Sequence, residues 1–310
     1  MNSPTMNTMT SSPDTAWNDV SFTTRDGLRL YGRHYAAGGS RRRAVLCLPG
    51  LTRNSRDFHD LALLLSDPRG HRRDVYTLDS RGRGLSDSDP DWKNYTVQVE
   101  VTDALDFITR LDLTDAAVLG TSRGGLLAMG IAAARPAAVG AVILNDIGPV
   151  IDRNGLSRIM AYVSRVPLPG NWVEAGRLVG DMSREAFPKL TNLDCEALAR
   201  QWFNDAGGRP APAYDPAIAR TFTLPEGPLP DLWRQFGALT RVPALVLRGA
   251  NSDLISDATV AEMGRRHPDL TSHLVPSEGH APLLRDSATQ AVIQAFLMRT
   301  DPVLGALIAA

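Results

Sequence analysis

The first part of the chain alternates short apolar runs with longer segments of helical periodicity. Residues 17–24 and 28–36 alternate apolar and polar positions on either side of an Asp-Gly turn signal, which predicts an antiparallel β-hairpin. The continuous apolar run at 43–50 ends in a Pro-Gly pair and precedes a helix-like segment at 55–67. A short run of this kind is typical of a strand buried on both faces.

The same succession of strand and helix then recurs. Further predicted strands lie at 74–82, 116–121, 138–146, 242–253 and 271–277, and helix-like segments lie at 96–111, 122–136, 257–268 and 287–300. Strands that alternate with helices indicate βαβ units. The pattern therefore predicts an α/β fold with a mostly parallel sheet and helices on both of its faces.

The succession is interrupted between about Val150 and Thr240. This part contains only helix-like pieces broken by Pro and Gly, and no β-like apolar run. A structureless loop of this length is uncommon in a compact domain, so we predict a helical cap over the ligand-binding edge of the sheet. Trp172, Trp202 and Trp233 lie in it and are candidates for substrate binding, although packing between cap helices would also account for them.

These patterns divide the chain into five parts. We expect a disordered polar leader at 1–16, a core made of 17–149 and 241–300, a helical cap (lid) at 150–240, and a C-terminal tail at 301–310. The leader has neither the basic nor the apolar region of a secretory signal, and no apolar run is long enough to span a membrane. The expected location is cytoplasmic.

Charge and cysteine content narrow the class of partner. The 33 basic and 34 acidic residues leave a formal net charge of -1, which offers no electrostatic basis for binding nucleic acid or an anionic membrane. The two cysteines cannot form a disulfide framework, and Cys47 lies in an apolar run, where we expect a buried reduced thiol. We expect a small-molecule substrate as the partner, with a homodimer as an open alternative.

The stretch 118–130 carries the main catalytic signal. It runs from an apolar strand end through Gly120, Thr121, Ser122, Arg123 and Gly124 into an apolar helix, which is the G-x-S-x-G arrangement of a serine nucleophile. Such a turn exposes the serine hydroxyl, and the two glycines leave room for it. The pattern predicts Ser122 as the nucleophile and the backbone N–H of the next residue as one donor to the oxyanion.

A serine nucleophile needs a general base and a third group that orients the base. His280 is the predicted base, because it lies in a loop just past the last predicted strand and the other five histidines have strand-, helix- or surface-like contexts. Asp146 and Asp253 both follow strands and are candidates for the acid. We predict Asp253, which precedes His280 by 27 residues and follows the strand next to it in sequence.

Six segments in order resemble the α/β-hydrolase superfamily, in its cap-bearing esterase-like branch: LPGLTRN, DSRGRGLSD, GTSRGG, NDIGP, RGANSD and EGHAP. The resemblance covers roughly 21–300 and implies an eight-stranded, mostly parallel sheet with an inserted cap. It also implies that the backbone N–H of Leu51 is the second oxyanion donor, although the family's usual His-Gly is Pro-Gly here. The DSRGRG segment resembles a structural turn of the family, with Arg81 in a buried ion pair.

Together these features predict a serine hydrolase that cleaves a small-to-medium carboxylic ester or lactone through an acyl-enzyme. The scheme requires no metal and no organic cofactor. The same triad could serve C–C bond hydrolysis, thioester cleavage or acyl transfer, and a ligand-binding protein without turnover is a further alternative. Arg123 places a charge beside the nucleophile; we expect it to pair with Asp146, or else to reach solvent or another carboxylate.

Overall fold

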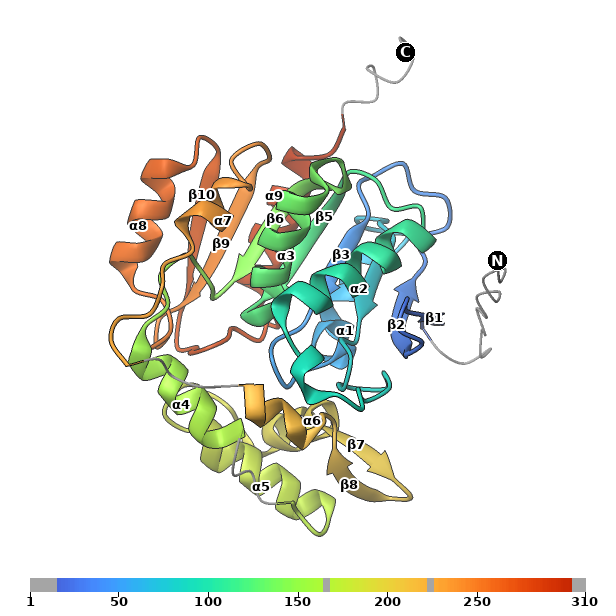
Figure 1. Cartoon of the computed structure of the whole chain (residues 1–310), viewed down its shortest axis with the longest axis vertical. Coiled ribbons are helices and arrows are strands. Elements are labelled where there is room, and N and C mark those ends of the chain that lie inside the picture. Colours follow the sequence, from blue (N-terminus) through green and yellow to red (C-terminus); the bar gives the residue numbers. More distant parts are fainter. Residues whose placement is uncertain (1–15, 164–167, 222–225, 303–310) are drawn as a thin grey trace.

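The computed structural model describes residues 16–163, 168–221 and 226–302. The predicted leader, apart from Ala16, and residues 303–310 of the predicted tail lie outside these ranges. One sheet has the strand order β1-β2-β4-β3-β5-β6-β9-β10, which confirms the predicted eight-stranded α/β-hydrolase sheet (Figure 1). Its strands are β1 (Asn18–Thr23), β2 (Arg29–Tyr35), β3 (Val45–Leu48), β4 (Val75–Leu78), β5 (Ala116–Thr121), β6 (Val139–Asn145), β9 (Ala244–Gly249) and β10 (Leu270–Val275).

The sheet is antiparallel at one edge and parallel elsewhere. β1 pairs antiparallel with β2, which confirms the predicted hairpin, and β2 pairs antiparallel with β4. From β4 to β10 the neighbouring strands are parallel. The carboxyl ends of these parallel strands therefore meet at one edge of the sheet, where open α/β folds bind their ligands.

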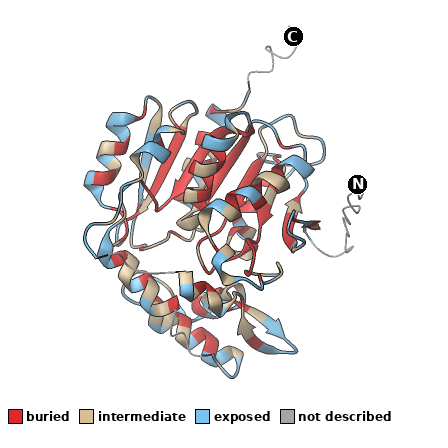
Figure 2. Ribbon diagram, in the orientation of Figure 1, coloured by how far each residue is buried: buried red, intermediate tan, exposed pale blue. Residues whose placement is uncertain are grey.

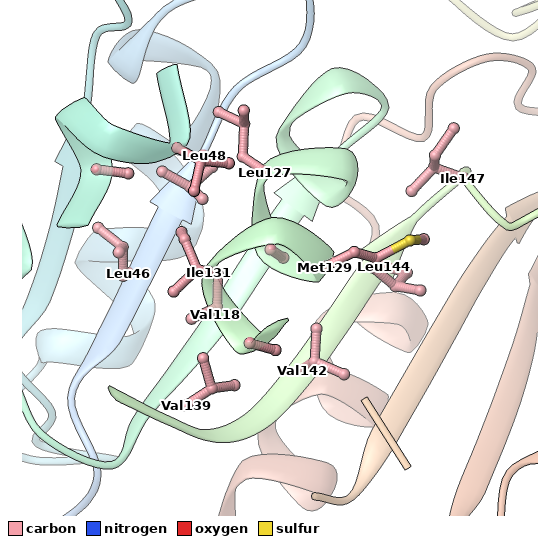
Figure 3. Packing of buried hydrophobic residues seen from close by; sticks show 14 of the residues in the cluster. Leu46, Leu48, Val118, Leu127, Met129, Ile131, Val139, Val142, Leu144 and Ile147 are labelled. Carbon is pink, nitrogen blue, oxygen red and sulfur yellow. The ribbon is translucent and has the colours of Figure 1, made fainter. Parts of the chain in front are cut away.

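Helices cover both faces of the sheet, and each face has its own apolar core. Along β5, Val118 faces the core formed with α2, α3 and α8, whereas Ala117 and Leu119 face the core formed with α1 and α9. Figure 3 shows Leu127 and Ile131 of α3 above the strands of the first core. The helices of the core are α1 (His59–Ser66), α2 (Val97–Arg110), α3 (Arg123–Ala134), α8 (Asp257–Arg266) and α9 (Ser287–Arg299).

Burial follows this layout. Figure 2 shows buried residues concentrated in the strands, and β6 is buried at every position, as expected of a strand covered on both faces. Cys47 on β3 is buried, as predicted, and this burial raises the pKa of its thiol. Within the described ranges, no helix has both the length and the apolar character needed to cross a bilayer.

The segment between β6 and β9 forms helices and one small hairpin. Its elements are α4 (Arg153–Val163), α5 (Trp172–Ser183), α6 (Asn192–Trp202), β7 (Phe203–Ala206), β8 (Arg209–Pro212) and α7 (Trp233–Gly237). The expectation of an insertion without strands is wrong, because β7 and β8 pair across Gly207 and Gly208, both at positive φ. These two strands contain too few apolar residues to show a β pattern. α7 packs on the sheet's core through Phe236.

The DSRGRG turn after β4 is structural, as predicted. The Arg81 side chain is 1% exposed and forms salt bridges with Asp26, Asp89 and Asp103. A buried guanidinium is tolerated only when its donors are satisfied in this way. Gly82 follows at a φ of 70°, in the left-handed region that favours glycine.

Candidate active site

Ser122 lies at the turn between β5 and α3, at the carboxyl edge of the sheet. Its backbone is in the left-handed region, with φ 52° and ψ −116°, a strained conformation that exposes the side chain at this kind of turn. A Cβ on Gly120 would lie 2.4 Å from the backbone of Gly124, and one on Gly124 would lie 2.0 Å from the Leu48 carbonyl oxygen. Close backbone approach therefore accounts for both glycines of the G-x-S-x-G pattern.

His280 lies in the loop between β10 and α9, and its ring reaches back across the sheet edge to Ser122. Its Nε2 is 2.8 Å from Ser122 Oγ, and the side chain is 7% exposed. The Asn145 amide donates to the Pro282 carbonyl at 2.9 Å, which ties the histidine loop to the end of β6. His280 is therefore placed to take the proton of the Ser122 hydroxyl.

Asp146, at the end of β6, is the carboxylate that contacts His280. Its Oδ2 lies 2.8 Å from His280 Nδ1 and also accepts from the Ser252 hydroxyl at 2.6 Å, while Oδ1 accepts from the Gly249 N–H at 2.9 Å. The side chain is fully buried. These donors compensate the buried charge and fix the carboxylate against the imidazole.

The prediction that Asp253 orients His280 is therefore wrong. The Asp253 carboxylate is 39% exposed and accepts two hydrogen bonds from Arg158 of α4, at 2.6 and 2.7 Å. Because β9 lies between β6 and β10, the histidine loop has to cross β9 to reach Ser122, and Asp146 is then the carboxylate beneath the ring. The Arg158 hydrogen bonds hold the pKa of Asp253 below its usual range.

The predicted pairing of Arg123 with Asp146 is also wrong. The Arg123 guanidinium turns toward α2, where its Nε donates to Glu100 Oε2 at 2.7 Å and its Nη2 donates to Glu100 Oε1 at 2.9 Å. The same Nη2 is 3.2 Å from the Tyr95 carbonyl oxygen. The charge beside the nucleophile is therefore neutralised by Glu100, which agrees with the alternative expectation that Arg123 pairs with another carboxylate.

Two backbone N–H groups beside Ser122 are open. Among the described residues, neither the Leu51 N–H nor the Arg123 N–H has a hydrogen-bond acceptor. Leu51 follows Gly50, whose added Cβ would lie 3.8 Å from Ser122 Cβ, so its loop passes directly beside the serine. Open N–H groups in this position suit a developing oxyanion.

A cavity of about 290 Å³ opens above Ser122, between the sheet edge and the insertion. It contains side chains from both parts, including Ser122, His280, Arg53, Arg158, Tyr162, Met182, Phe187 and Trp202. A second cavity of about 210 Å³ shares the wall formed by Arg53, Tyr162, Met182 and Trp202. In that wall the Arg53 guanidinium lies 4.3 Å from the centre of the Trp202 ring.

Only one of the three predicted tryptophans, all of them described, lines the main cavity. Trp202 does so. Trp172 packs on the apolar cluster of α5 and α6, as Trp202 also does, and Trp233 packs on Phe236 with ring centres 5.8 Å apart. A substrate-binding role for Trp172 and Trp233 stays a prediction, and packing accounts for both rings among the described residues. In the described ranges, no three His, Cys, Asp or Glu side chains are grouped so as to hold a metal ion.

Comparison with known proteins agrees with this architecture. The chain is 34% identical to a 3-hydroxybutyrate-oligomer hydrolase of Cupriavidus necator, over 87% of this chain and 93% of that protein. It is 30% identical to an N-formylmaleamate deformylase of Pseudomonas putida, over 80% and 85% of the two chains. A crystal structure of an α/β hydrolase from Novosphingobium aromaticivorans superposes with a TM-score of 0.84 at 37% identity, and covers 92% of this chain and 99% of that one. The family model described as alpha/beta hydrolase family matches residues 45–295, and the chain belongs to this family.

Proposed function

We propose that this chain is a serine hydrolase that cleaves a small-to-medium carboxylic ester or lactone through an acyl-enzyme. The observation that carries the proposal is the hydrogen-bonded series Ser122, His280 and Asp146 at the wall of a cavity. Ser122 Oγ attacks the carbonyl carbon while His280 Nε2 takes its proton. Asp146 keeps the other ring nitrogen protonated and stabilises the imidazolium that forms.

The tetrahedral intermediate carries its negative charge on the former carbonyl oxygen. The backbone N–H groups of Leu51 and Arg123 donate to this oxygen, and each such donor typically contributes about 10²–10³ in rate. As the intermediate collapses, the bond to the alcohol oxygen breaks and His280 returns its proton to that oxygen. Water then attacks the acyl-enzyme with His280 as base, which releases the acid and restores Ser122.

The cavity and the relatives support esters of modest size as substrates. The volume of about 290 Å³ is close to the lower limit of the range for small-molecule sites, about 300–1,000 Å³. The relative from Cupriavidus necator acts on oligomers of 3-hydroxybutyrate, in which hydroxy-acid units are joined as esters. Short oligoesters of a hydroxy acid are therefore suitable first substrates for this chain.

A second candidate is hydrolysis of an N-formyl amide, because another relative is an N-formylmaleamate deformylase. The chemistry would use the same serine and histidine, with His280 giving its proton to a leaving nitrogen instead of an oxygen. C–C bond hydrolysis, thioester cleavage and acyl transfer would also use these residues. Relative kcat/KM values on a panel of esters, lactones, thioesters and N-formyl amides would rank them.

Active-site labelling and turnover test the proposal together. The folded protein is treated with a fluorophosphonate and assayed on p-nitrophenyl esters of increasing acyl length, several lactones and a 3-hydroxybutyrate dimer. We expect a covalent adduct on Ser122, and at least about a 10⁴-fold loss of kcat/KM in Ser122→Ala.

Ser183→Ala is the matched control, because Ser183 is buried and lines the same cavity, whereas the His280 ring bonds to Ser122 and Asp146 in the described residues. We expect it to keep kcat/KM within about threefold of the wild type and to retain the adduct on Ser122. Ester hydrolysis that survives Ser122→Ala would contradict the assigned nucleophile. Folded wild-type protein that neither reacts with the fluorophosphonate nor turns over any ester would instead support binding without catalysis.

A further inference from the structure

Glu100, in the first turn of α2, is a buried carboxylate that the proposed reaction does not use. Its side chain is 1% exposed, and it lies between two guanidiniums. Oε1 accepts from Arg83 Nη1 at 2.8 Å and from Arg123 Nη2 at 2.9 Å, while Oε2 accepts from Arg123 Nε at 2.7 Å. One carboxylate therefore joins the turn after β4 to the first residue of α3.

Arg83 connects Glu100 to Leu51, which carries one of the two N–H groups that lack an acceptor among the described residues. Arg83 Nε donates to the Leu51 carbonyl oxygen at 2.8 Å, and Nη1 also donates to the Arg81 carbonyl oxygen at 2.7 Å. The Arg83 side chain is 1% exposed, so these contacts are formed away from water. Arg83 thereby fixes the position of Leu51, whose N–H has no acceptor among the described residues.

Arg123 carries the other N–H group that lacks an acceptor among the described residues. Arg123 supplies that N–H itself, at the amino end of α3, and its side chain is anchored on Glu100 and the Tyr95 carbonyl. Leu51 and Arg123 lie on separate loops that follow β3 and β5. Leu51 and Arg123 are thus both held through the Glu100 carboxylate, Leu51 by way of Arg83 on Oε1 and Arg123 by its own contacts to Oε1 and Oε2.

The charges explain why the tether depends on a carboxylate. Burial alone would raise the pKa of Glu100, but the guanidiniums of Arg83 and Arg123 outweigh this effect and hold the pKa below its usual value. Without the negative charge of Glu100, the buried Arg83 guanidinium and the partly buried Arg123 guanidinium would face each other without this counter-charge, which is unfavourable. The two loops would then move apart or rearrange.

We propose that Glu100 is a positioning residue that sets the spacing of the Leu51 and Arg123 N–H groups for the oxyanion. This inference rests on the proposed serine-hydrolase function. Glu100 does not touch the substrate and acts only through Arg83 and Arg123. Its effect should therefore appear in the stabilisation of the tetrahedral intermediate and not in the binding of the substrate.

Glu100→Gln tests the proposal, because it keeps the side-chain shape and removes the charge. We expect kcat to fall by about 10–100-fold, somewhat less than removal of a donor, with KM within about threefold of the wild type. A trifluoromethyl ketone provides a second measurement, because Ser122 Oγ adds to its carbonyl carbon while the serine proton passes to His280. The former carbonyl oxygen then carries a negative charge in the position of the oxyanion. Its inhibition constant should rise by the same factor as kcat falls.

Asp103→Asn is the matched control. Asp103 lies three residues further along α2, is 3% exposed and also pairs with a buried arginine, but that arginine is Arg81, whose side chain reaches neither Leu51 nor Arg123. It should lower stability to a similar degree, measured as the urea midpoint, and keep kcat and the ketone affinity within about threefold. Should Glu100→Gln fail to fold, Arg123→Met removes one of the two guanidiniums and should show the same pattern with a smaller loss.

Two results would overturn the inference. One is a folded Glu100→Gln whose kcat and ketone affinity stay within twofold of the wild type. The other is an equal loss of kcat in Glu100→Gln and Asp103→Asn. Failure of the proposed function is distinguishable, because the wild type itself would then show no adduct on Ser122 and no ester hydrolysis.

Discussion

Asp146 Oδ2 lies 2.8 Å from His280 Nδ1, and two further donors, the Gly249 N–H and the Ser252 hydroxyl, hold the same carboxylate. Asp146→Asn should therefore lower kcat by about 10⁴-fold, because an amide in this place favours the wrong histidine tautomer. The measurement is steady-state ester hydrolysis at a pH where the wild type is fully active.

Asp253→Asn is the comparison for this prediction, since Asp253 was the sequence-based choice and pairs with Arg158 instead. It should change kcat by less than about tenfold. A large loss in Asp253→Asn together with near-normal activity in Asp146→Asn would restore Asp253 as the acid and show that the loop after β9 rearranges during turnover.

The choice between these two aspartates shows where sequence reasoning reached its limit. Ser122 and His280 are found from local patterns, a tight strand-to-helix turn and a loop after the last strand. The acid depends on which strands are neighbours in space. Asp253 is closer to His280 along the chain, but β6 is hydrogen-bonded to β5, so Asp146 lies nearer to the nucleophile. The strand order, which periodicity does not encode, decides which of the two aspartates contacts His280.

Side-chain partners were equally hard to infer. Glu100 and Asp103 are buried positions of α2 and alternate along the chain with the buried Val101 and Ala104. Two carboxylates at buried helix positions are a signal of buried basic partners, because an unpaired charge there is costly. The sequence carries this signal, yet it leaves open that the partners are Arg123 and Arg81. The strands, the helices and the core were predictable because they follow from repeated apolar patterns.

The ion pair between Arg158 and Asp253 joins the insertion to the core and should contribute modestly to stability. A double-mutant cycle with Arg158→Gln and Asp253→Asn should give a coupling free energy of about 0.5–1 kcal/mol, because both side chains are partly exposed. Urea unfolding measures it. Arg184 and Asp181, an exposed pair within the insertion, should couple by less than about 0.5 kcal/mol. Equal couplings in the two cycles would argue against a specific tie between the insertion and the core.

Trp202 is one of four residues that line both cavities, and we predict that it limits acyl-chain length. Trp202→Ala would remove the ring that Arg53 stacks on and join the cavities of about 290 and 210 Å³. We expect the ratio of kcat/KM for octanoyl over acetyl esters to rise by about tenfold, since each buried methylene group contributes about 0.8 kcal/mol.

Trp233→Ala is the control for that experiment, because Trp233 packs on Phe236 of α7 and does not line the cavity. It should lower the free energy of unfolding by up to about 3 kcal/mol and leave the octanoyl-to-acetyl ratio unchanged. A ratio that changes equally in both variants would mean that chain length is not set by the wall between the cavities.

Stability should decrease as the pH falls below about 6.5, and His267 should be one cause. His267 is buried at the end of α8, its Nε2 is 3.0 Å from the Leu239 carbonyl oxygen, and its Nδ1 accepts from the Asp269 N–H at 3.1 Å. Burial lowers the pKa of His267 in the folded protein, so over the pH range between the folded and unfolded values the unfolded chain binds more protons. The stability contributed by the neutral ring is complete above the unfolded pKa, near 6.5, and is lost as the pH falls toward the folded pKa.

Thermal unfolding of the wild type and His267→Gln between pH 8 and pH 5 measures this effect. The melting temperature of the wild type should decrease more over this range than that of the variant, because the variant lacks the titrating ring at this position. Burial lowers the pKa of His59 and His71 as well, so the variant should keep part of the slope. Phe236→Leu, which alters packing against the same ring, should lower the melting temperature by a similar amount at each pH. Parallel curves for the wild type and His267→Gln would exclude His267 as a source of the acid sensitivity.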